Sequence, residues 1–539
     1  MNGVILTAGR VDSSLVPLFG EIPTGLVPIN GKPILFFIIE HFLENHITDI
    51  FIGVGLQADY LERITRTYFS RKASLHFVKA DANKGPGDTL LTVFKEIGKG
   101  AAVVNLADSY VKFTATDFCD VDTVLVSQDI ESSERWCTAE IDPETRTISR
   151  FYDKEPHQAP KNVLVGIYYF SDVSSFEGLR PQTKRTQISD LLTFRTQSAR
   201  VTAQETSTWL DFGHIDKYQS AKKEMLAARF FNSLEFDNLL GTVTKRSQDI
   251  AKFVEEIRWQ LELPPKLKIL FPRIVNYEIY SKHPFITMEY YSYQSVAEIW
   301  LFSSLEVRSL ISLLNRLLRI LKLFREVPAF VKPEAYVGMY QRKTDERIRL
   351  LISTNPTFAQ ILEEDEVTIN GRTYKNWRKI RSEVMSHLSS LYSEEYNCLI
   401  HGDFCFSNIL YDVNGGIIRL LDPRGSWGNG PGGDIRYDLA KLRHSVCGLY
   451  DFIVNDLFVV QNDGSSITYE IFSQPHHKTV GNEFDQAIAA QDYSLRQIKL
   501  IEGVLFLSML PLHADSQSRQ LVMYCRGIEL LNESLDIDI

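Results

Sequence analysis

The segment from His401 to Asn408, together with the Asp-Pro-Arg-Gly turn that begins at Asp422, restricts the fold of this chain more than any other feature of its sequence. Asp403 and Asn408 are close enough for one tight loop to present both side chains. An apolar run, an Asn-Gly-Gly turn and a second apolar run then predict a β-hairpin that delivers Asp422. Phosphoryl transfer from ATP needs a carboxylate beside the acceptor hydroxyl, plus an amide oxygen and a second carboxylate on Mg²⁺. We therefore predict Asp403 as the catalytic residue, with Asn408 and Asp422 as metal ligands. The alternative is a surface loop followed by an ordinary hairpin.

These residues resemble the catalytic loop of the aminoglycoside phosphotransferase and choline kinase superfamily. That loop also runs His-Gly-Asp, four residues, Asn, and its metal-binding Asp also opens a turn like Asp-Pro-Arg-Gly. Downstream, Asp434 and Asp438 resemble the helix start that steadies the loop in that family, which implies a structural role for both. The resemblance implies a bilobal, protein-kinase-like α+β domain. It also implies ATP as phosphoryl donor and a sugar, polyol or amino alcohol as acceptor.

A kinase-like small lobe should contain a phosphate-binding lysine on a strand and a glutamate on the next helix. Lys245 ends a β-like run at 241–245, and residues 248–261 have apolar side chains at helical spacing, with Glu256 near the edge of the apolar face. We predict that Lys245 binds the ATP phosphates and pairs with Glu256. A solvated lysine and a helix-surface glutamate would give the same pattern.

Residues 286–291 predict the last strand of this lobe and a hinge, whose backbone from Glu289 to Tyr291 would bind adenine. Tyr290, Tyr291 and Tyr293 lie close together in sequence. They are interpreted either as hinge packing or as a cage for a quaternary ammonium group.

The N-terminal part carries a different pattern. A buried-type strand at 4–8 ends in a glycine turn, and a Leu-Val-Pro segment at 26–28 leads to an apolar helix. Further strands alternate with helical patterns, which predicts an α/β domain with a mostly parallel, doubly wound sheet and a nucleotide site at the carboxyl ends of its strands.

The order of these segments resembles the sugar-phosphate nucleotidyltransferase family. The resemblance implies one Mg²⁺ held by Asp108 and Asp211, an oxygen-ligand site that suits a hard cation. Both could instead be surface carboxylates. The residues expected to contact the nucleotide are Leu6, Ala8, Gly9, Arg10 and Gly85.

The sequence lacks two positively charged residues that are typical of that family. Ser14 stands near the place of the family's arginine, and Thr24 follows Pro23 where the family has a lysine. Arg10 is a candidate replacement. Loss of two cations that offset charge at phosphorus would slow the reaction by orders of magnitude. Two hypotheses therefore stay open, a working nucleotidyltransferase and an inactive, ligand-binding domain.

Length and composition fit two domains, because 539 residues with 44% hydrophobic content exceed one core. We predict domains at 1–228 and 229–539. The net charge of −10 argues against nucleic acid and anionic membranes as partners, which leaves small molecules. The six cysteines show neither paired nor metal-like spacing, and we see no apolar run long enough for a bilayer, so we expect a cytoplasmic protein.

Taken together, the sequence predicts a bifunctional enzyme. One domain phosphorylates a small hydroxylated molecule with ATP, and the other transfers a nucleotidyl group to the product, with CTP or UTP expected ahead of GTP and Mg²⁺ in both steps. Resemblance alone places the product in surface-glycan synthesis. The alternatives are a kinase with an inactive N-terminal domain and a regulatory protein that uses both folds as sensors.

Overall fold

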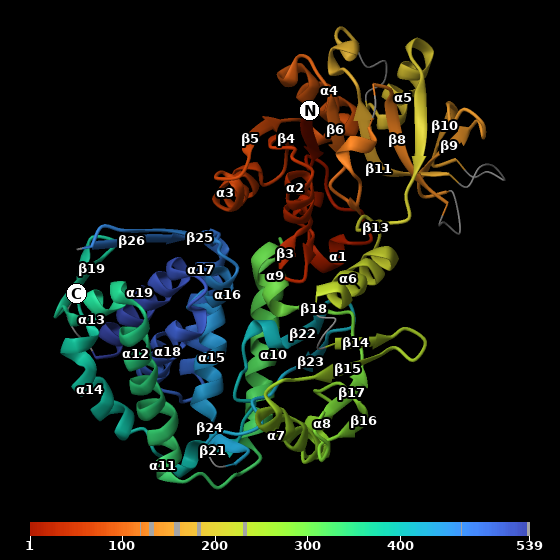
Figure 1. The fold of residues 1–539 in the computed structure, drawn as a ribbon. Coiled ribbons are helices and arrows are strands. Elements are labelled where there is room, and N and C mark those ends of the chain that lie inside the picture. The colour runs from red at the N-terminus through yellow and green to blue at the C-terminus, as the bar shows by residue number, and fades with distance from the viewer. Residues whose placement is uncertain are drawn as a thin grey trace. The chain divides into compact units, whose positions relative to one another are not determined.

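The chain forms two compact units in the computed structural model (Figure 1). The N-terminal unit comprises Met1–Leu226 and Phe302–Ser304, and the C-terminal unit comprises Ala227–Leu301 and Leu305–Ile539. The structure describes residues 1–118, 120–128, 134–155, 162–179, 185–229, 234–428, 430–464 and 466–535. Within them, no helix is long and apolar enough to cross a membrane.

The centre of the N-terminal unit is a set of parallel strands in the order β6, β1, β4, β5. Their bounds are Asn2–Leu6 for β1, Asp49–Val54 for β4, Ser74–Lys79 for β5 and Ala102–Asn105 for β6, and the connecting helices are α2 (Ile34–Glu44), α3 (Ala58–Phe69) and α4 (Pro86–Ile97). A Cβ atom at Gly3 would lie 2.5 Å from Phe42 of α2, and one at Gly53 would lie 2.6 Å from Thr89 of α4. Gly53 pairs in register with Leu6, which points to the face opposite Gly3, so α2 and α4 cover opposite faces of the sheet.

The sheet as a whole is mixed, and the prediction of a mostly parallel sheet is wrong in this respect. β11 (Val163–Phe170) runs antiparallel to β6, β8 (Asp122–Ser127) and β9 (Cys137–Ile141), and β9 pairs antiparallel with β10 (Ile148–Asp153). β12 (Val201–Glu205) then lies parallel to β8. Between β8 and β11 the described residues form β9 and β10 and no crossover helix, and such a helix is the usual connection between parallel neighbours.

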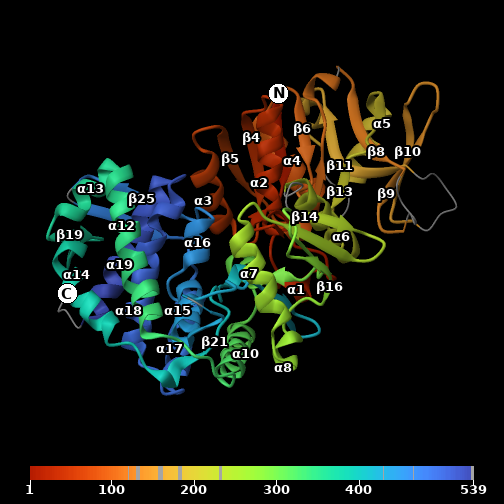
Figure 2. The ribbon, with the colours of Figure 1, turned by 60° about the horizontal axis from the view of Figure 1, so that its bottom comes forward.

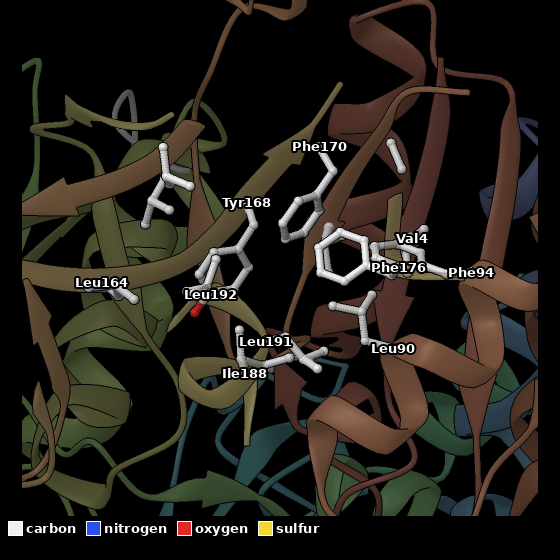
Figure 3. Close-up of a cluster of buried hydrophobic side chains, with 14 of the residues drawn as sticks. Val4, Leu90, Phe94, Leu164, Tyr168, Phe170, Phe176, Ile188, Leu191 and Leu192 are labelled. Atoms are coloured by element: carbon white, nitrogen blue, oxygen red, sulfur yellow. The ribbon is translucent and has the colours of Figure 1, made fainter. Parts of the chain in front are cut away.

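A buried apolar cluster fixes the sheet beneath α4 and α5 (Ile188–Ser198), as Figure 3 shows. Phe94 of α4 packs edge to face on Phe170 of β11, with ring centroids 5.5 Å apart. Leu191 and Leu192 of α5 lie in the same cluster. This core holds the strand ends at which the N-terminal site lies.

The C-terminal unit begins with an antiparallel sheet in the order β14, β15, β17, β16. The bounds are Leu234–Asp237 for β14, Thr242–Arg246 for β15, Ile274–Glu278 for β16 and Phe285–Glu289 for β17. α7 (Ile250–Leu261) shares a buried cluster with this sheet through Phe253 and Ile257, which contact Ile286 and Met288. The predicted strand at 241–245 and helix at 248–261 correspond to β15 and α7.

The rest of this unit is mainly helical. The long helices are α10 (Val307–Arg325), α12 (Lys343–Thr354), α15 (Ile435–Val446), α18 (Leu495–Met509) and α19 (Gln517–Ser534). Figures 1 and 2 show α12, α18 and α19 side by side, with α15 against α18. The predicted hairpin is present as β22 (Ile409–Asp412) and β23 (Ile417–Leu420), which pair antiparallel.

Candidate functional site

The loop that carries Asp403 is held by the first turn of α15. The carboxylate of Asp438 accepts hydrogen bonds from the backbone N–H groups of His401 and Gly402 at 2.7 and 2.8 Å. Gly402 has φ +77°, and a Cβ atom there would lie 2.6 Å from the Cβ atom of Arg424. Glycine is therefore required, because the loop passes directly against the turn after β23.

Asp403 lies between a cation and an amide. Lys441 of α15 contacts its Oδ1 at 2.9 Å, and the amide of Asn408 donates to its Oδ2 at 2.9 Å. Burial by itself would raise the pKa of Asp403, but Lys441 and Asn408 outweigh burial and hold that pKa below its usual value. His401 is buried, which lowers its pKa to about 4, and its Nδ1 accepts from the N–H of Asp403 at 3.2 Å. The neutral ring thus braces the loop.

Lys245 of β15 links α7 to the turn that follows β23. Its ammonium contacts Glu256 of α7 at 2.8 Å and Asp422 at 2.7 Å. Burial by itself would lower the pKa of Lys245, but Asp422 and Glu256 outweigh it and raise that pKa. A Cβ atom at Gly425 would lie 2.6 Å from the backbone nitrogen of Glu256, so the turn after Asp422 presses on α7.

The structure brings the predicted residues Lys245, Glu256, Asp403, Asn408 and Asp422 to one hollow, here called the C-terminal hollow. Sequence reasoning missed Lys441 as the partner of Asp403. One signal was available: Lys441 is one turn after Asp438 on the same helix, so both side chains lie on one face.

Glu289 and Tyr291, predicted at the adenine-binding hinge, do not line the C-terminal hollow. The Tyr291 hydroxyl donates to Glu289 at 2.9 Å, and Arg273 forms an ion pair with Glu289 at 2.9 Å. Both residues line a different hollow with β16 and α8 (Pro265–Lys268). Their side chains do not meet Lys245, and the backbone N–H of Glu289 already donates to the carbonyl of Arg273 at 3.0 Å.

The neighbouring tyrosines do not converge. Tyr290 packs edge to face on Phe236, with centroids 5.2 Å apart, whereas Tyr291 packs against Tyr293 at 5.3 Å. The guanidinium of Arg419 lies 4.8 Å from the centre of the Tyr291 ring. This arrangement favours hinge packing over a cage.

In the N-terminal unit, the residues that follow β1 meet those that follow β6. One hollow, here called the strand-end hollow, is lined by all of the predicted nucleotide contacts and one predicted metal ligand: Leu6, Ala8, Gly9, Arg10, Gly85 and Asp108. Gly85 stands immediately before α4 with φ +90°, and a Cβ atom there would lie 2.4 Å from the carbonyl oxygen of Thr186. The start of α4 at this hollow suits a phosphate. Arg10 forms an exposed ion pair with Glu21 at 2.6 Å.

Asp108 and Asp211 come together through β7 (Ser109–Val111) and β13 (Trp209–Asp211), in which Asp211 is paired with Ser109. A Cβ atom at Gly213 would lie 3.2 Å from Oδ1 of Asp211 and 3.6 Å from Oδ2 of Asp108, so both carboxylates border the same small space. Burial and the negative charge of Asp211 raise the pKa of Asp108 to about 7. A divalent cation would relieve this repulsion, so the two side chains fit a shared Mg²⁺.

Asp211 also has fixed partners. His214 contacts its Oδ2 at 2.8 Å, and the indole of Trp136 donates to the same oxygen at 3.3 Å. The hydrogen bond to Asp211 raises the pKa of His214. A second hollow, lined by Trp136 and Asp211, shares Asp108 with the strand-end hollow. Asp108 therefore lies where two ligands could meet.

The departures from the family pattern also lie here. Thr24 and Asp12 line the strand-end hollow, and the N–H of Ser14 donates to Asp12 at 2.9 Å. Lys154 and Arg185 line the same hollow. Sequence reasoning missed these two cations, because each lies far from the glycine turn in sequence.

Comparison with known proteins gives a family for the N-terminal unit. Residues 2–228 match the nucleotidyl transferase family model, and this part of the chain is a nucleotidyltransferase domain. The bifunctional protein GlmU of Methanococcus maripaludis strain C5 is 25% identical over 231 residues, which are 42% of this chain and 54% of that protein. The low-salt glycan biosynthesis nucleotidyltransferase Agl11 of Haloferax volcanii is 26% identical over 196 residues, 34% of this chain and 53% of that protein. The chain thus spans about half the length of the curated relatives it matches.

Solved structures cover the same part. A putative glucose-1-phosphate thymidylyltransferase from Bacillus anthracis is 21% identical with a TM-score of 0.36, covering 42% of this chain and 94% of that chain. A UDP-glucose pyrophosphorylase complexed with UDP-glucose is 18% identical with a TM-score of 0.37, covering 42% of this chain and 99% of that chain.

Proposed function

We propose that this protein is a bifunctional enzyme. Its C-terminal unit, a bilobal kinase-like domain, phosphorylates a small hydroxylated molecule with ATP, and its N-terminal unit transfers a nucleotidyl group to the phosphorylated product. The observation that carries the kinase assignment is the contact of Lys245 with both Glu256 and Asp422, in the same hollow as Asp403 and Asn408. An ion pair that only stabilised the fold would not need the carboxylate of Asp403 and the amide of Asn408, a potential metal ligand, in the same hollow.

In the kinase step, Lys245 would neutralise the ATP phosphates while Asn408 and Asp422 hold Mg²⁺, which offsets charge on the transferring phosphoryl group. Asp403 would orient the acceptor hydroxyl and receive its proton. The acceptor oxygen then bonds to the γ-phosphorus as the bond to ADP breaks. Lys441 keeps Asp403 ionised for this role.

In the nucleotidyl step, the new phosphate would attack the α-phosphorus of a second nucleoside triphosphate, and pyrophosphate would leave. Nucleotidyl transferases of this family use a nucleoside triphosphate and Mg²⁺. Asp108 and Asp211 would hold that ion between the two hollows, and Lys154 and Arg185 would supply positive charge at the strand-end hollow. We propose CTP or UTP ahead of GTP, and a product used in glycan assembly, which is the role that the name of the Haloferax relative gives for that protein.

The second candidate is a kinase whose N-terminal unit binds nucleotide without turnover. Ser14 and Thr24 favour this candidate, because neither replaces the expected cation, and Asp12 adds a carboxylate to the strand-end hollow. Lys154 and Arg185 favour the first candidate.

The test is incubation of the full chain with ATP, Mg²⁺ and a pool of candidate alcohols, followed by mass spectrometry, with CTP, UTP or GTP added in parallel. Asp211→Ala should abolish the nucleotide conjugate and leave the phosphorylated product unchanged. Asp49→Ala is the matched control, because Asp49 is a half-exposed carboxylate at the start of β4 paired only with His76 among the described residues. A phosphorylated product without any conjugate would favour the second candidate. The absence of any phosphorylated product would contradict both candidate functions.

A further inference from the structure

The C-terminal hollow contains cations that the kinase step does not use. Lys343 and Arg347 are one turn apart on α12, and Arg424 follows Asp422 in the turn after β23. All three side chains are half-buried and line the hollow that holds Asp403.

These cations have neutral partners. The ammonium of Lys343 lies 3.4 Å from the Tyr437 hydroxyl, Arg347 donates to the carbonyl of Ser508 at 2.7 Å, and Arg424 donates to the carbonyl of Ser426 at 3.1 Å. Within the part of the chain that the structure describes, none of the three forms an ion pair with a carboxylate, whereas Lys245 and Lys441 both do. The hollow therefore has positive charge that the protein leaves unmatched.

Their position places this charge on the acceptor side of Asp403. Lys245 reaches Asp422 from β15, where the proposed kinase step would place the ATP phosphates. Tyr437, beside Lys343, is one turn before Lys441 on α15, and Lys441 contacts Asp403. A molecule that brings its hydroxyl to Asp403 from the side of α12 would thus lie against Lys343 and Arg347.

The ionisation of the cluster agrees with this geometry. Burial, together with the charges of Arg424, Arg347 and Lys441, lowers the pKa of Lys343 to about 8. Burial by itself would raise the pKa of Tyr437, but Lys343, Arg424 and Lys441 lower it to about 8. The lowered pKa of Tyr437 means that the surrounding cations favour a negative charge here.

We propose that the acceptor is a hydroxylated oxyacid, whose carboxylate or phosphate group binds Lys343, Arg347 and Arg424 while its hydroxyl lies at Asp403. Guanidinium groups suit both anions, because they can donate two parallel hydrogen bonds. This inference rests on the proposed kinase function and narrows it. Cationic amino alcohols, which stood among the expected acceptors, would be repelled.

The test compares matched acceptors on the full chain: glycerol, glycerate, glycerol 3-phosphate and ethanolamine. At least one acidic member should exceed glycerol and ethanolamine in kcat/KM by about 10-fold or more. Arg347→Gln and Lys343→Gln should each raise the KM for that acid about 10- to 100-fold, the range expected for a lost hydrogen bond to a charged group. The KM for ATP should stay within about twofold, and Arg347→Lys should restore part of the loss.

Arg349→Gln is the matched control on the same helix, because that side chain is 74% exposed and its contact with Asp345 is long, at 3.9 Å. A readout independent of turnover is binding of inorganic phosphate by calorimetry with ADP and Mg²⁺ present, which Arg347→Gln should weaken and Arg349→Gln should not.

The outcomes are distinguishable. Preference for neutral or cationic alcohols, with Arg347→Gln unchanged, overturns the inference and leaves the kinase standing. The inference is also overturned if Arg347→Gln and Lys343→Gln raise the KM for ATP and leave the KM for the acceptor unchanged, because the cluster then binds the ATP phosphates. If no alcohol is phosphorylated but phosphate binding depends on Arg347, the anion site stands and the kinase function fails.

Discussion

At the scale of single residues, the charge on Asp403 decides what this group can do. A carboxylate whose pKa is held low is a weak base. In the proposed kinase step, Asp403 would therefore mainly orient the acceptor hydroxyl and would take the proton late. Lys441 and Asn408 fix its two oxygens, and His401 fixes its backbone.

Asp403→Asn should lower kcat about 100-fold or more, because the amide cannot accept the hydroxyl proton. Binding of ATP should stay nearly intact, since Lys245, Asn408 and Asp422 remain. Steady-state kinetics and nucleotide titration would check both. Retention of more than about a tenth of the wild-type turnover would show that the role is misassigned.

The acceptor KM should depend on pH through the pair of Lys343 and Tyr437. Each has a pKa of about 8. Loss of the Lys343 proton removes a positive charge and loss of the Tyr437 proton adds a negative one, so either loss lowers by one the net charge of a cluster that also contains Arg347, Arg424 and Lys441. The positive charge of the cluster is therefore highest well below pH 8 and decreases as the pH rises through 8. The KM for a carboxylic acid acceptor should therefore rise severalfold between about pH 7 and 9, while that for a neutral acceptor stays flat. A KM for the acid that does not change with pH in the wild-type chain would contradict this prediction.

At the scale of elements, close packing between segments far apart in sequence positions the loop. Asp438 of α15 holds the backbone of His401 and Gly402, and Arg424 lies against Gly402. Lys245 ties β15 to the turn after β23. The geometry of the C-terminal hollow thus depends on α15, β15 and the hairpin together.

Gly402→Ala tests this packing. The added Cβ atom would meet Arg424 at 2.6 Å in a left-handed conformation, so we expect a loss of kcat along with a lower melting temperature. Gly371→Ala is the control, because Gly371 in the turn between β19 (Glu366–Ile369) and β20 (Arg372–Lys375) has φ +79° with no atom within 4 Å. That variant should cost about 1 to 2 kcal/mol in stability and leave turnover unchanged. Equal turnover in the two variants would argue against the close approach.

At the scale of the whole molecule, each unit has its own buried core, and each candidate site lies within one unit. The predicted boundary at 228 falls close to the division after Leu226, and it remains a prediction about independent folding. Phe302–Ser304 group with the N-terminal unit although they are distant in sequence.

Fragments 1–228 and 229–539 should each fold, because each retains a core. The shorter fragment should melt below the full chain, since it lacks 302–304. The longer fragment should keep phosphoryl transfer. Circular dichroism melts and gel filtration would check folding. Aggregation of both fragments would mean that the boundary is wrong.

The sequence by itself determined which candidate groups lie together within short segments. Asp403 and Asn408 share one loop, Asp422 ends the adjoining hairpin, and the pattern at 241–261 gave Lys245 and Glu256, because loop length, strand alternation and helical period are local properties. Only the tertiary structure placed Lys441 on Asp403 and gathered Lys343, Arg347 and Arg424 around one hollow. It also decided that β11 runs antiparallel to β6. Those facts depend on which distant segments pack together. Burial and electrostatic interactions between such segments act through space, so the spacing of residues along the chain does not predict them.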